Sequence, residues 1–219
     1  MGVFDIIGPV MIGPSSSHTA GAARLGKMAR TILGEIPVEA ALTLYGSFAR
    51  TYKGHGTDKA LVAGLLGFPT EDIRIKDSFA LAARANLTVS FHAAEKENCH
   101  PNTVAFYLKG ASGRTVRVVG ASLGGGQIHI SNIDGYEVEF TGDYYTLITI
   151  HQDQPGIIAA ITQILAQQQV NIAFMKVSRK QKGAQALMIL ETDQPIPQET
   201  AVMLNAITTI EAVRLVQPL

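Results

Sequence analysis

The last third of the chain carries the pattern that most restricts its fold. Residues 144–151, YYTLITIH, are an apolar and β-branched run typical of a strand, and a turn at Pro155-Gly156 follows. The next apolar residues have the spacing of an amphipathic helix: Ile157, Ile158, Ile161, Ile164 and Leu165. The remaining predicted elements are strands at 171–180, 184–192 and 211–216 and a helix after Pro197. The order β-α-β-β-α-β predicts a ferredoxin-like domain.

Within this domain, residues 151–172 have the sequence HQDQPGIIAAITQILAQQQVNI, which resembles the opening of an ACT domain, the small-molecule regulatory module of amino-acid metabolism. The resemblance implies an allosteric ligand site at His151, Asp153 and Asn171, between two paired modules. Asp153 stands where related serine-binding ACT domains have asparagine. A carboxylate there would accept from a ligand ammonium group but would repel a ligand carboxylate. The alternative is that the module serves only for pairing.

Residues 1–142 predict an α+β domain, and residues 143–219 the ferredoxin-like one, with the boundary at Thr141-Gly142-Asp143. A helical stripe follows Ser15-Ser16-Ser17 and ends at Gly34. The other predicted elements are a strand at 38–44, helices at 57–66 and 78–85, and strands at 86–93, 103–109, 114–122, 127–133 and 136–140.

The charge of the chain restricts its partners. Lys and Arg number 18, as do Asp and Glu, so the formal net charge is zero. Such a chain has no broad attraction for nucleic acid or for an anionic membrane. We expect a small molecule or another protein as partner.

Cys99 is the one cysteine in the sequence. It excludes a disulfide framework, is consistent with a cytoplasmic location, and cannot by itself hold an iron–sulfur cluster. No zinc-ligand spacing such as HExxH accompanies it, so no metal site is expected within this chain. Gly8, Pro9, Gly13 and Pro14 interrupt the apolar N-terminal stretch, so neither a signal peptide nor a membrane span is expected there.

The segment Gly13–Thr19, GPSSSHT, is the strongest local feature of the first domain. One hydroxyl is enough to cap a helix, so three serines in a row exceed the structural need. Hydroxyls beside the free N–H groups of a helix start form a cradle for a carboxylate or phosphate, and His18 could donate to the same ligand. The alternative is an ordinary serine cap with a surface histidine.

A second segment, Gly54–Lys59, has the sequence GHGTDK. Its glycines let the backbone approach a ligand and hold His55 at a tight corner. Neither the P-loop nor the dinucleotide-binding pattern fits it. The alternative is a glycine-rich turn that happens to contain a histidine. A third segment, His100-Pro101-Asn102-Thr103, opens a strand, and Pro101 restricts His100 to an extended conformation; the alternative is a simple turn.

Three segments, VFDIIGPVMIGPSSSHTAGAARLG, LYGSFARTYKGHGTDKA and HPNT, occur together and in an order that resembles the beta portion of iron–sulfur L-serine dehydratases. That portion is similar in fold to the allosteric substrate-binding domain of some phosphoglycerate dehydrogenases. The resemblance implies conversion of L-serine to pyruvate and ammonia. It also implies a 4Fe-4S cluster ligated by a cysteine-bearing alpha subunit, here a separate chain, and a homodimer formed through either domain.

The resemblance further implies the roles of individual residues. His55 is the candidate general base, although His18 stays open for that role. His18 and the cradle of Ser15, Ser16, Ser17 and Thr19 would hold the substrate carboxylate or shape the mouth of the cluster site, and Asn102 of HPNT is a further substrate-binding candidate.

Two other classes of protein stay open. A non-catalytic amino-acid-binding regulatory module would also explain the ACT domain and the scarcity of cysteine, but it has no need for SSSHT and GHGTDK to face a common cleft. A pyridoxal-phosphate lyase would need a Schiff-base lysine on a much larger scaffold.

Overall fold

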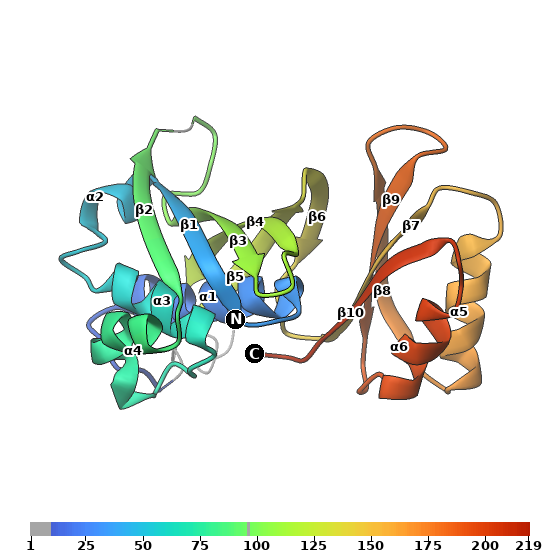
Figure 1. Cartoon of the computed structure of the whole chain (residues 1–219), viewed down its shortest axis with the longest axis horizontal. Helices are drawn as coiled ribbons and strands as arrows, with labels where there is room; N and C mark the ends of the chain where they lie inside the picture. Colours follow the sequence, from blue (N-terminus) through green and yellow to red (C-terminus); the bar gives the residue numbers. More distant parts are fainter. Residues whose placement is uncertain (1–9, 96) are drawn as a thin grey trace. The chain divides into compact units, whose positions relative to one another are not determined.

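A computed structural model describes residues 10–95 and 97–219 of the chain (Figure 1). The beginning of the N-terminal motif, with Gly8 and Pro9, lies outside the described residues. The chain divides after Gly135 into two compact units.

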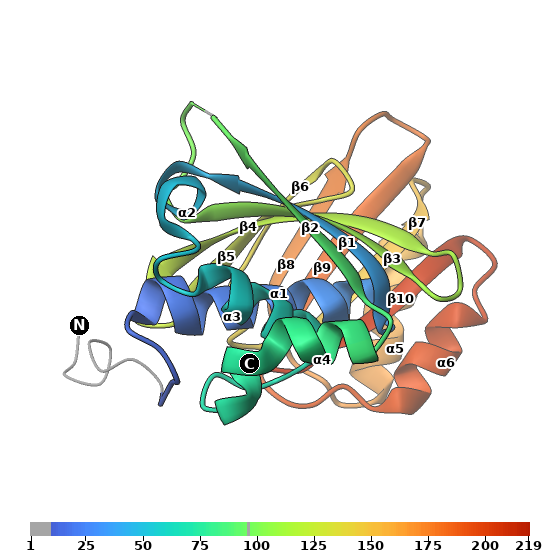
Figure 2. The ribbon, with the colours of Figure 1, turned by 60° about the vertical axis from the view of Figure 1, so that its left-hand side comes forward.

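The first sheet has the strand order β2-β1-β3-β4-β5-β6. Its strands are β1 (Pro37–Tyr45), β2 (Thr88–Ala94), β3 (Thr103–Gly110), β4 (Thr115–Gly124), β5 (Gln127–Ile133) and β6 (Tyr136–Phe140). β1 runs parallel to β2 and antiparallel to β3. The helices of the first unit are α1 (Gly21–Leu33), α2 (Gly46–Thr51), α3 (Thr57–Leu66) and α4 (Ser78–Arg84). Figure 2 shows α1, α3 and α4 along one face of this sheet.

Helix α1 carries the predicted apolar stripe on its buried face and ends, as predicted, at Gly34, whose φ is 83°. A π-helical turn, Ser16–Ala20, precedes it and contains His18. α1 and α3 pack so closely that a Cβ on Gly64 would lie only 2.1 Å from the Ala23 carbonyl oxygen. The two helices therefore fix the positions of the segments that precede them, SSSHT and GHG.

Two short elements were not among the predictions. α2 has six residues, and Phe48 alone among them is buried, so it offers no apolar period to detect. A 3₁₀ turn at Ile73–Asp77 is equally short.

The second unit has the predicted order of elements. They are β7 (Tyr145–Gln152), α5 (Ile157–Gln167), β8 (Ile172–Arg179), β9 (Gln185–Thr192), α6 (Gln198–Asn205) and β10 (Ile210–Val216). The sheet order is β10-β7-β9-β8, which leaves β8 at an edge. The core lies between the sheet and the two helices, where Leu147, Ile161, Leu165, Met188 and Leu190 pack together. The α+β class and the ferredoxin-like arrangement are confirmed.

The division after Gly135 lies in the turn of the β5–β6 hairpin, so β6 is grouped with the second unit. The predicted boundary between residues 142 and 143 falls one strand later and stays a prediction. None of the helices in the described part of the chain has both the length and the apolar character needed to cross a membrane.

Candidate functional site

Two histidines of the first unit lie in contact. The ring centroids of His18 and His55 are 4.8 Å apart, with an angle of 67° between the ring planes. His18 comes from the π-helical turn before α1, and His55 from the loop before α3. Segments that are far apart in the sequence, SSSHT and GHGTDK, thus lie in contact through these two rings.

The His18 ring is held at both nitrogens. Nδ1 lies 3.0 Å from the Ser17 hydroxyl, and Nε2 lies 3.3 Å from the Ser47 hydroxyl of α2. The Phe48 ring packs edge-on against the imidazole. Burial and, to a lesser extent, the neighbouring His55 lower the pKa of His18, which favours its neutral form. His18 is therefore a fixed ring that exchanges hydrogen bonds with hydroxyls.

His55 is placed differently. It is exposed, and its backbone N–H donates to the Thr51 carbonyl at 3.1 Å. No described residue hydrogen-bonds to its ring nitrogens, so they are open to a ligand. Gly56 follows with a φ of 68° and is the N-cap residue of α3, whereas a Cβ on Gly54 would meet nothing closer than 3.7 Å. Of the two glycines, Gly56 is the one that the corner requires.

A small pocket of about 150 Å³ opens beside His55. Its lining residues are Ile12, Gly13, Pro14, Thr19, His55, Gly56, Lys59, Ile75 and Lys76. Thr19 is buried, and its hydroxyl has no hydrogen-bond partner among the described residues. The lining of the pocket is mostly apolar, and the Thr19 hydroxyl is buried beneath it. Lys59, Lys76 and His55 are the residues here that can donate to a small anionic group such as a carboxylate.

The serines of the predicted cradle make internal hydrogen bonds: Ser15 caps the turn and Ser17 contacts the His18 ring, while a ligand at these serines stays a prediction. The Ser15 hydroxyl accepts from the His18 backbone N–H at 3.3 Å and lies 3.3 Å from the Ser17 hydroxyl. Ser17 contacts the His18 ring, as described above. The Ser16 side chain makes no hydrogen bond within the described residues, but its carbonyl accepts from the Gly21 N–H.

The HPNT segment packs on α2 rather than on the histidines. The Phe48 N–H donates to the Pro101 carbonyl at 3.2 Å, and a Cβ on Gly46 would collide with Pro101. Asn102 donates to the Ser122 carbonyl at 3.4 Å. The segment therefore supports the helix that carries Ser47, while its predicted contact between Asn102 and substrate stays a prediction.

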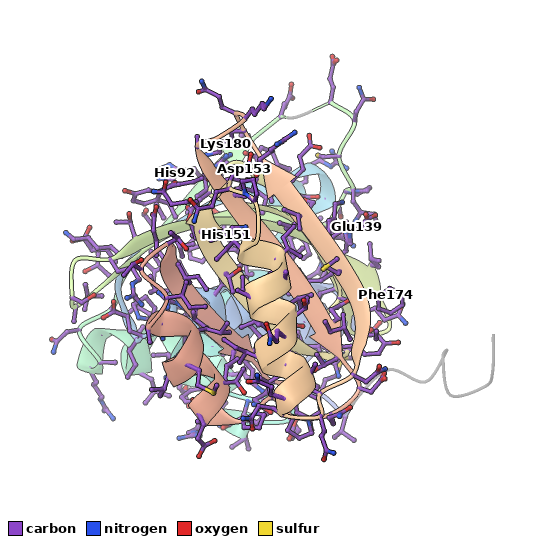
Figure 3. The ribbon with its side chains drawn as sticks, turned by 90° about the vertical axis from the view of Figure 1, so that its right-hand side faces the viewer. His92, Glu139, His151, Asp153, Phe174 and Lys180 are labelled. Carbon is purple, nitrogen blue, oxygen red and sulfur yellow. The ribbon has the colours of Figure 1, made fainter. Side chains whose placement is uncertain are left out.

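The three predicted allosteric residues do not converge within one module. His151 is buried and its Nδ1 lies 3.2 Å from the Thr149 hydroxyl, with Asp153 close to it in Figure 3. Asn171 donates to Asp193 at 2.8 Å. Because Asp153 lies beside the carboxyl end of β8 and Asn171 precedes its first residue, they stand at opposite ends of that strand.

The Asp153 carboxylate has an ion-pair partner and a backbone hydrogen-bond donor. It accepts from Arg179 at 2.8 Å and from the Gly183 N–H at 3.0 Å. The Gly183 N–H and Arg179 lower its pKa. Its charge is thus compensated, which reduces the repulsion expected for a ligand carboxylate.

The donors of this chain do not fit an iron–sulfur cluster. Cys99 is its one cysteine, and the described residues contain no group of three histidine, cysteine or acidic side chains placed to hold a metal ion. Thiolates for a cluster would have to come from elsewhere.

Sequence reasoning missed Ser47, Ile75 and Lys76. Ser47 lies on the undetected helix α2, and the other two lie on the short 3₁₀ turn. The one available signal was indirect: GSFART lies two residues before the GHG corner, within the segment LYGSFARTYKGHGTDKA that carries the family resemblance.

The fold defines the class of the protein: an α+β unit with a pocket beside two histidines in contact, followed by a ferredoxin-like unit. Comparison with known proteins identifies the class further. The family model described as serine dehydratase beta chain matches residues 2–88, and the ACT domain model matches residues 145–201. The chain is 45% identical to the probable L-serine dehydratase beta chain of Bacillus subtilis, over 89% of this chain and 88% of that protein.

A second relative is the L-serine dehydratase beta chain of Peptoniphilus asaccharolyticus, 39% identical over the same shares of both chains. This chain therefore belongs to the family of L-serine dehydratase beta chains and ends in an ACT domain. D-3-phosphoglycerate dehydrogenase of Bacillus subtilis is 25% identical over 89% of this chain and 37% of its own length, which agrees with the predicted resemblance of the first domain.

Proposed function

We propose that this chain is the beta subunit of a cytoplasmic L-serine dehydratase that converts L-serine to pyruvate and ammonia with a cysteine-bearing alpha subunit. The contact between His18 and His55 beside a pocket with lysines carries the proposal. The names of the two similar beta chains support the substrate, and the lone Cys99 supports a partner that holds the 4Fe-4S cluster. When bound, such a cluster supplies a Lewis acid for the leaving hydroxyl.

His55 is the group we assign as general base. It is exposed and its ring nitrogens have no hydrogen-bond partner among the described residues, whereas both nitrogens of His18 face hydroxyls. As base, His55 takes the α-proton of serine, the Cα–H electron pair forms the Cα=Cβ bond, and the Cβ–O bond breaks. The aminoacrylate that results is hydrolysed to pyruvate and ammonia.

We assign His18 and the hydroxyls around it to holding the substrate. Thr19, Lys59 and Lys76 line the pocket on the side of His55 and suit the serine carboxylate. Ser15 and Ser17 fix the backbone and ring of His18. A neutral His18 adds no positive charge beside His55, and such a charge would make a general base weaker.

Anaerobic co-expression with a cysteine-bearing alpha chain tests the division of labour. We expect a coloured complex that releases pyruvate from L-serine, and no turnover by the purified beta chain alone. Serine deamination by the beta chain free of metal and of any second polypeptide would contradict the proposal. A complex that binds serine without turnover would instead support a non-catalytic binding module.

For the ACT domain we propose an effector site shared by two copies of the chain. Since Asp153 and Asn171 lie at opposite ends of the edge strand β8, an antiparallel pairing of two β8 strands would bring Asp153 of one copy near Asn171 of the other. Calorimetry of the chain with L-serine tests this site, with Asn171→Ala as the variant expected to abolish binding. No heat and no thermal shift with the native chain would favour a module used only for pairing.

A further inference from the structure

The second unit also contains a pocket. It lies near the first residues of β8, whereas the Asp153 turn lies beside the last residue of that strand. It has a volume of about 260 Å³ and lies between β6 and the end of the sheet where β8 begins. The residues that line it are Glu139, Phe174, Met175, Lys176, Ile189 and Glu191. Figure 3 labels Glu139 and Phe174, both toward the right-hand edge of the view.

The strand register places this pocket on the face of the sheet that α5 and α6 do not cover. Leu190 and Met188 of β9 belong to the core with those helices, so Ile189 and Glu191 point to the other face. Their partners on β8 are Lys176 and Phe174. β6 lies across this face, because Lys176 pairs with Glu139 at 3.1 Å and the Ser178 hydroxyl donates to the Glu137 carbonyl.

Glu191 is the unusual residue in this pocket. It is 8% exposed, and its Oε1 atom has no hydrogen-bond partner among the described residues. Burial, together with the nearby Asp143 carboxylate, raises its pKa. Most buried polar groups have a partner, and an unpaired one costs free energy, so an oxygen left open inside a pocket indicates a missing donor.

The rest of the lining describes the ligand that would supply this donor. The carboxylates of Glu139 and Glu191 outnumber the single ammonium group of Lys176, which favours a cationic group beside Glu191. Besides its ion pair with Glu139, Lys176 has exposed N–H groups that can donate to a second anionic group. Phe174 is 57% exposed and Ile189 forms part of the wall, so an apolar group would gain contact area there.

We propose that this pocket binds an α-amino acid with an aliphatic side chain. Its ammonium group would donate to Glu191, its carboxylate would meet Lys176, and its side chain would lie on Phe174 and Ile189. The pocket lies at the Asn171 end of β8, but it does not include Asn171, whose side chain donates to Asp193. It also uses the face of the sheet, whereas pairing along β8 uses the edge of the strand.

Calorimetry with L-leucine on the full chain tests the proposal. We expect saturable binding in the native chain, and a rise in Kd of about tenfold or more in Glu191→Gln, which keeps the shape but loses the charged acceptor. Glu199→Gln, at an exposed position of α6, is the matched control and should bind as the native chain does. Absence of binding to the native chain, or equal binding by Glu191→Gln, would overturn the proposal.

Two analogues and a second variant separate the roles of the charged groups. 4-Methylpentanoate, which lacks the ammonium group, should not bind, and 3-methylbutylamine, which lacks the carboxylate, should bind more weakly than L-leucine. Lys176→Met, at an exposed position, should weaken binding of L-leucine but not of the amine, and it keeps the test available if Glu191→Gln does not fold. Equal affinity of all three compounds would show non-specific apolar binding and would overturn the proposal.

Discussion

His18 and His55 differ in what surrounds their ring nitrogens, and this difference separates their roles. Ser17 and Ser47 occupy both nitrogens of His18, and burial lowers its pKa. His55 keeps its nitrogens open to the pocket. A group that transfers protons needs a free nitrogen within reach of the substrate, and a group that positions needs a fixed ring. These surroundings support the roles that we propose, proton transfer for His55 and positioning of the substrate for His18.

Ser47 tests the positioning role. Ser47→Ala removes the hydroxyl at Nε2 of His18 and should lower kcat of the assembled enzyme by about tenfold through misplacement of the ring, with a smaller change in KM. Ser47→Thr keeps the hydroxyl and should restore most of the loss. Thermal unfolding checks that both variants fold. If Ser47→Ala retains native kcat, His18 does not depend on this hydrogen bond for its position.

His151 makes the stability of the second unit depend on pH. Burial lowers the pKa of His151, against a smaller opposing effect of Asp153. The unfolded chain takes up a proton near its ordinary pKa of about 6.5, and the folded chain does so only at lower pH. The stability that the neutral ring contributes is therefore complete above about pH 6.5 and is lost as the pH falls below it.

The measurement compares the native chain with His151→Gln by urea unfolding. The difference in unfolding free energy between the two should shrink between about pH 7.5 and about pH 5.5. His92→Gln changes an exposed histidine and should leave the pH dependence of the native chain in place. A difference that stays constant over this range would show that His151 titrates alike in both states.

At the scale of elements, the contact between α1 and α3 sets the geometry of the site. A Cβ on Gly26 would lie 2.4 Å from the Leu61 carbonyl oxygen, and one on Gly64 would lie 2.1 Å from that of Ala23. These two glycines let the helix backbones touch. Since His18 precedes α1 and His55 precedes α3, the helix contact fixes the separation of the two rings.

Gly64→Ala should therefore affect both stability and activity. The added methyl group forces the helices apart, which we expect to cost about 1–3 kcal/mol of unfolding free energy and to lower kcat in the assembled enzyme. The control for stability is Gly54→Ala, whose added methyl would meet nothing closer than 3.7 Å. Equal unfolding free energies in both variants would show that the helices can separate without cost.

Helices and strands with a clear periodicity of apolar residues could be predicted from the sequence, and short elements could not. The stripe from Ile157 to Leu165 and the cap at Gly34 correctly placed α5 and the end of α1. Six residues of α2 contain no full apolar period, so Ser47 could not be placed beside His18. The contact between His18 and His55 depends on the packing of Gly26 against α3, a long-range fact that neither motif contains.

At the scale of the whole molecule, the two units carry different sites. The first holds the histidine pair, and the second holds the turn at Asp153 and the pocket at Glu191. The family resemblance predicted the first two of these sites from motifs. It could not predict the pocket, because Glu191 lies inside an apolar strand and its isolation is visible only when β6 and β8 come together.

The kcat of His55→Ala in the complex with the alpha chain tests the central claim most directly. The exposed His92→Ala serves as control, and co-purification of the alpha chain checks assembly in both. We expect kcat for pyruvate release from L-serine to fall by about 10²-fold or more in His55→Ala and to stay near the native value in His92→Ala. Native turnover by an assembled His55→Ala complex would show that this imidazole does not take the proton.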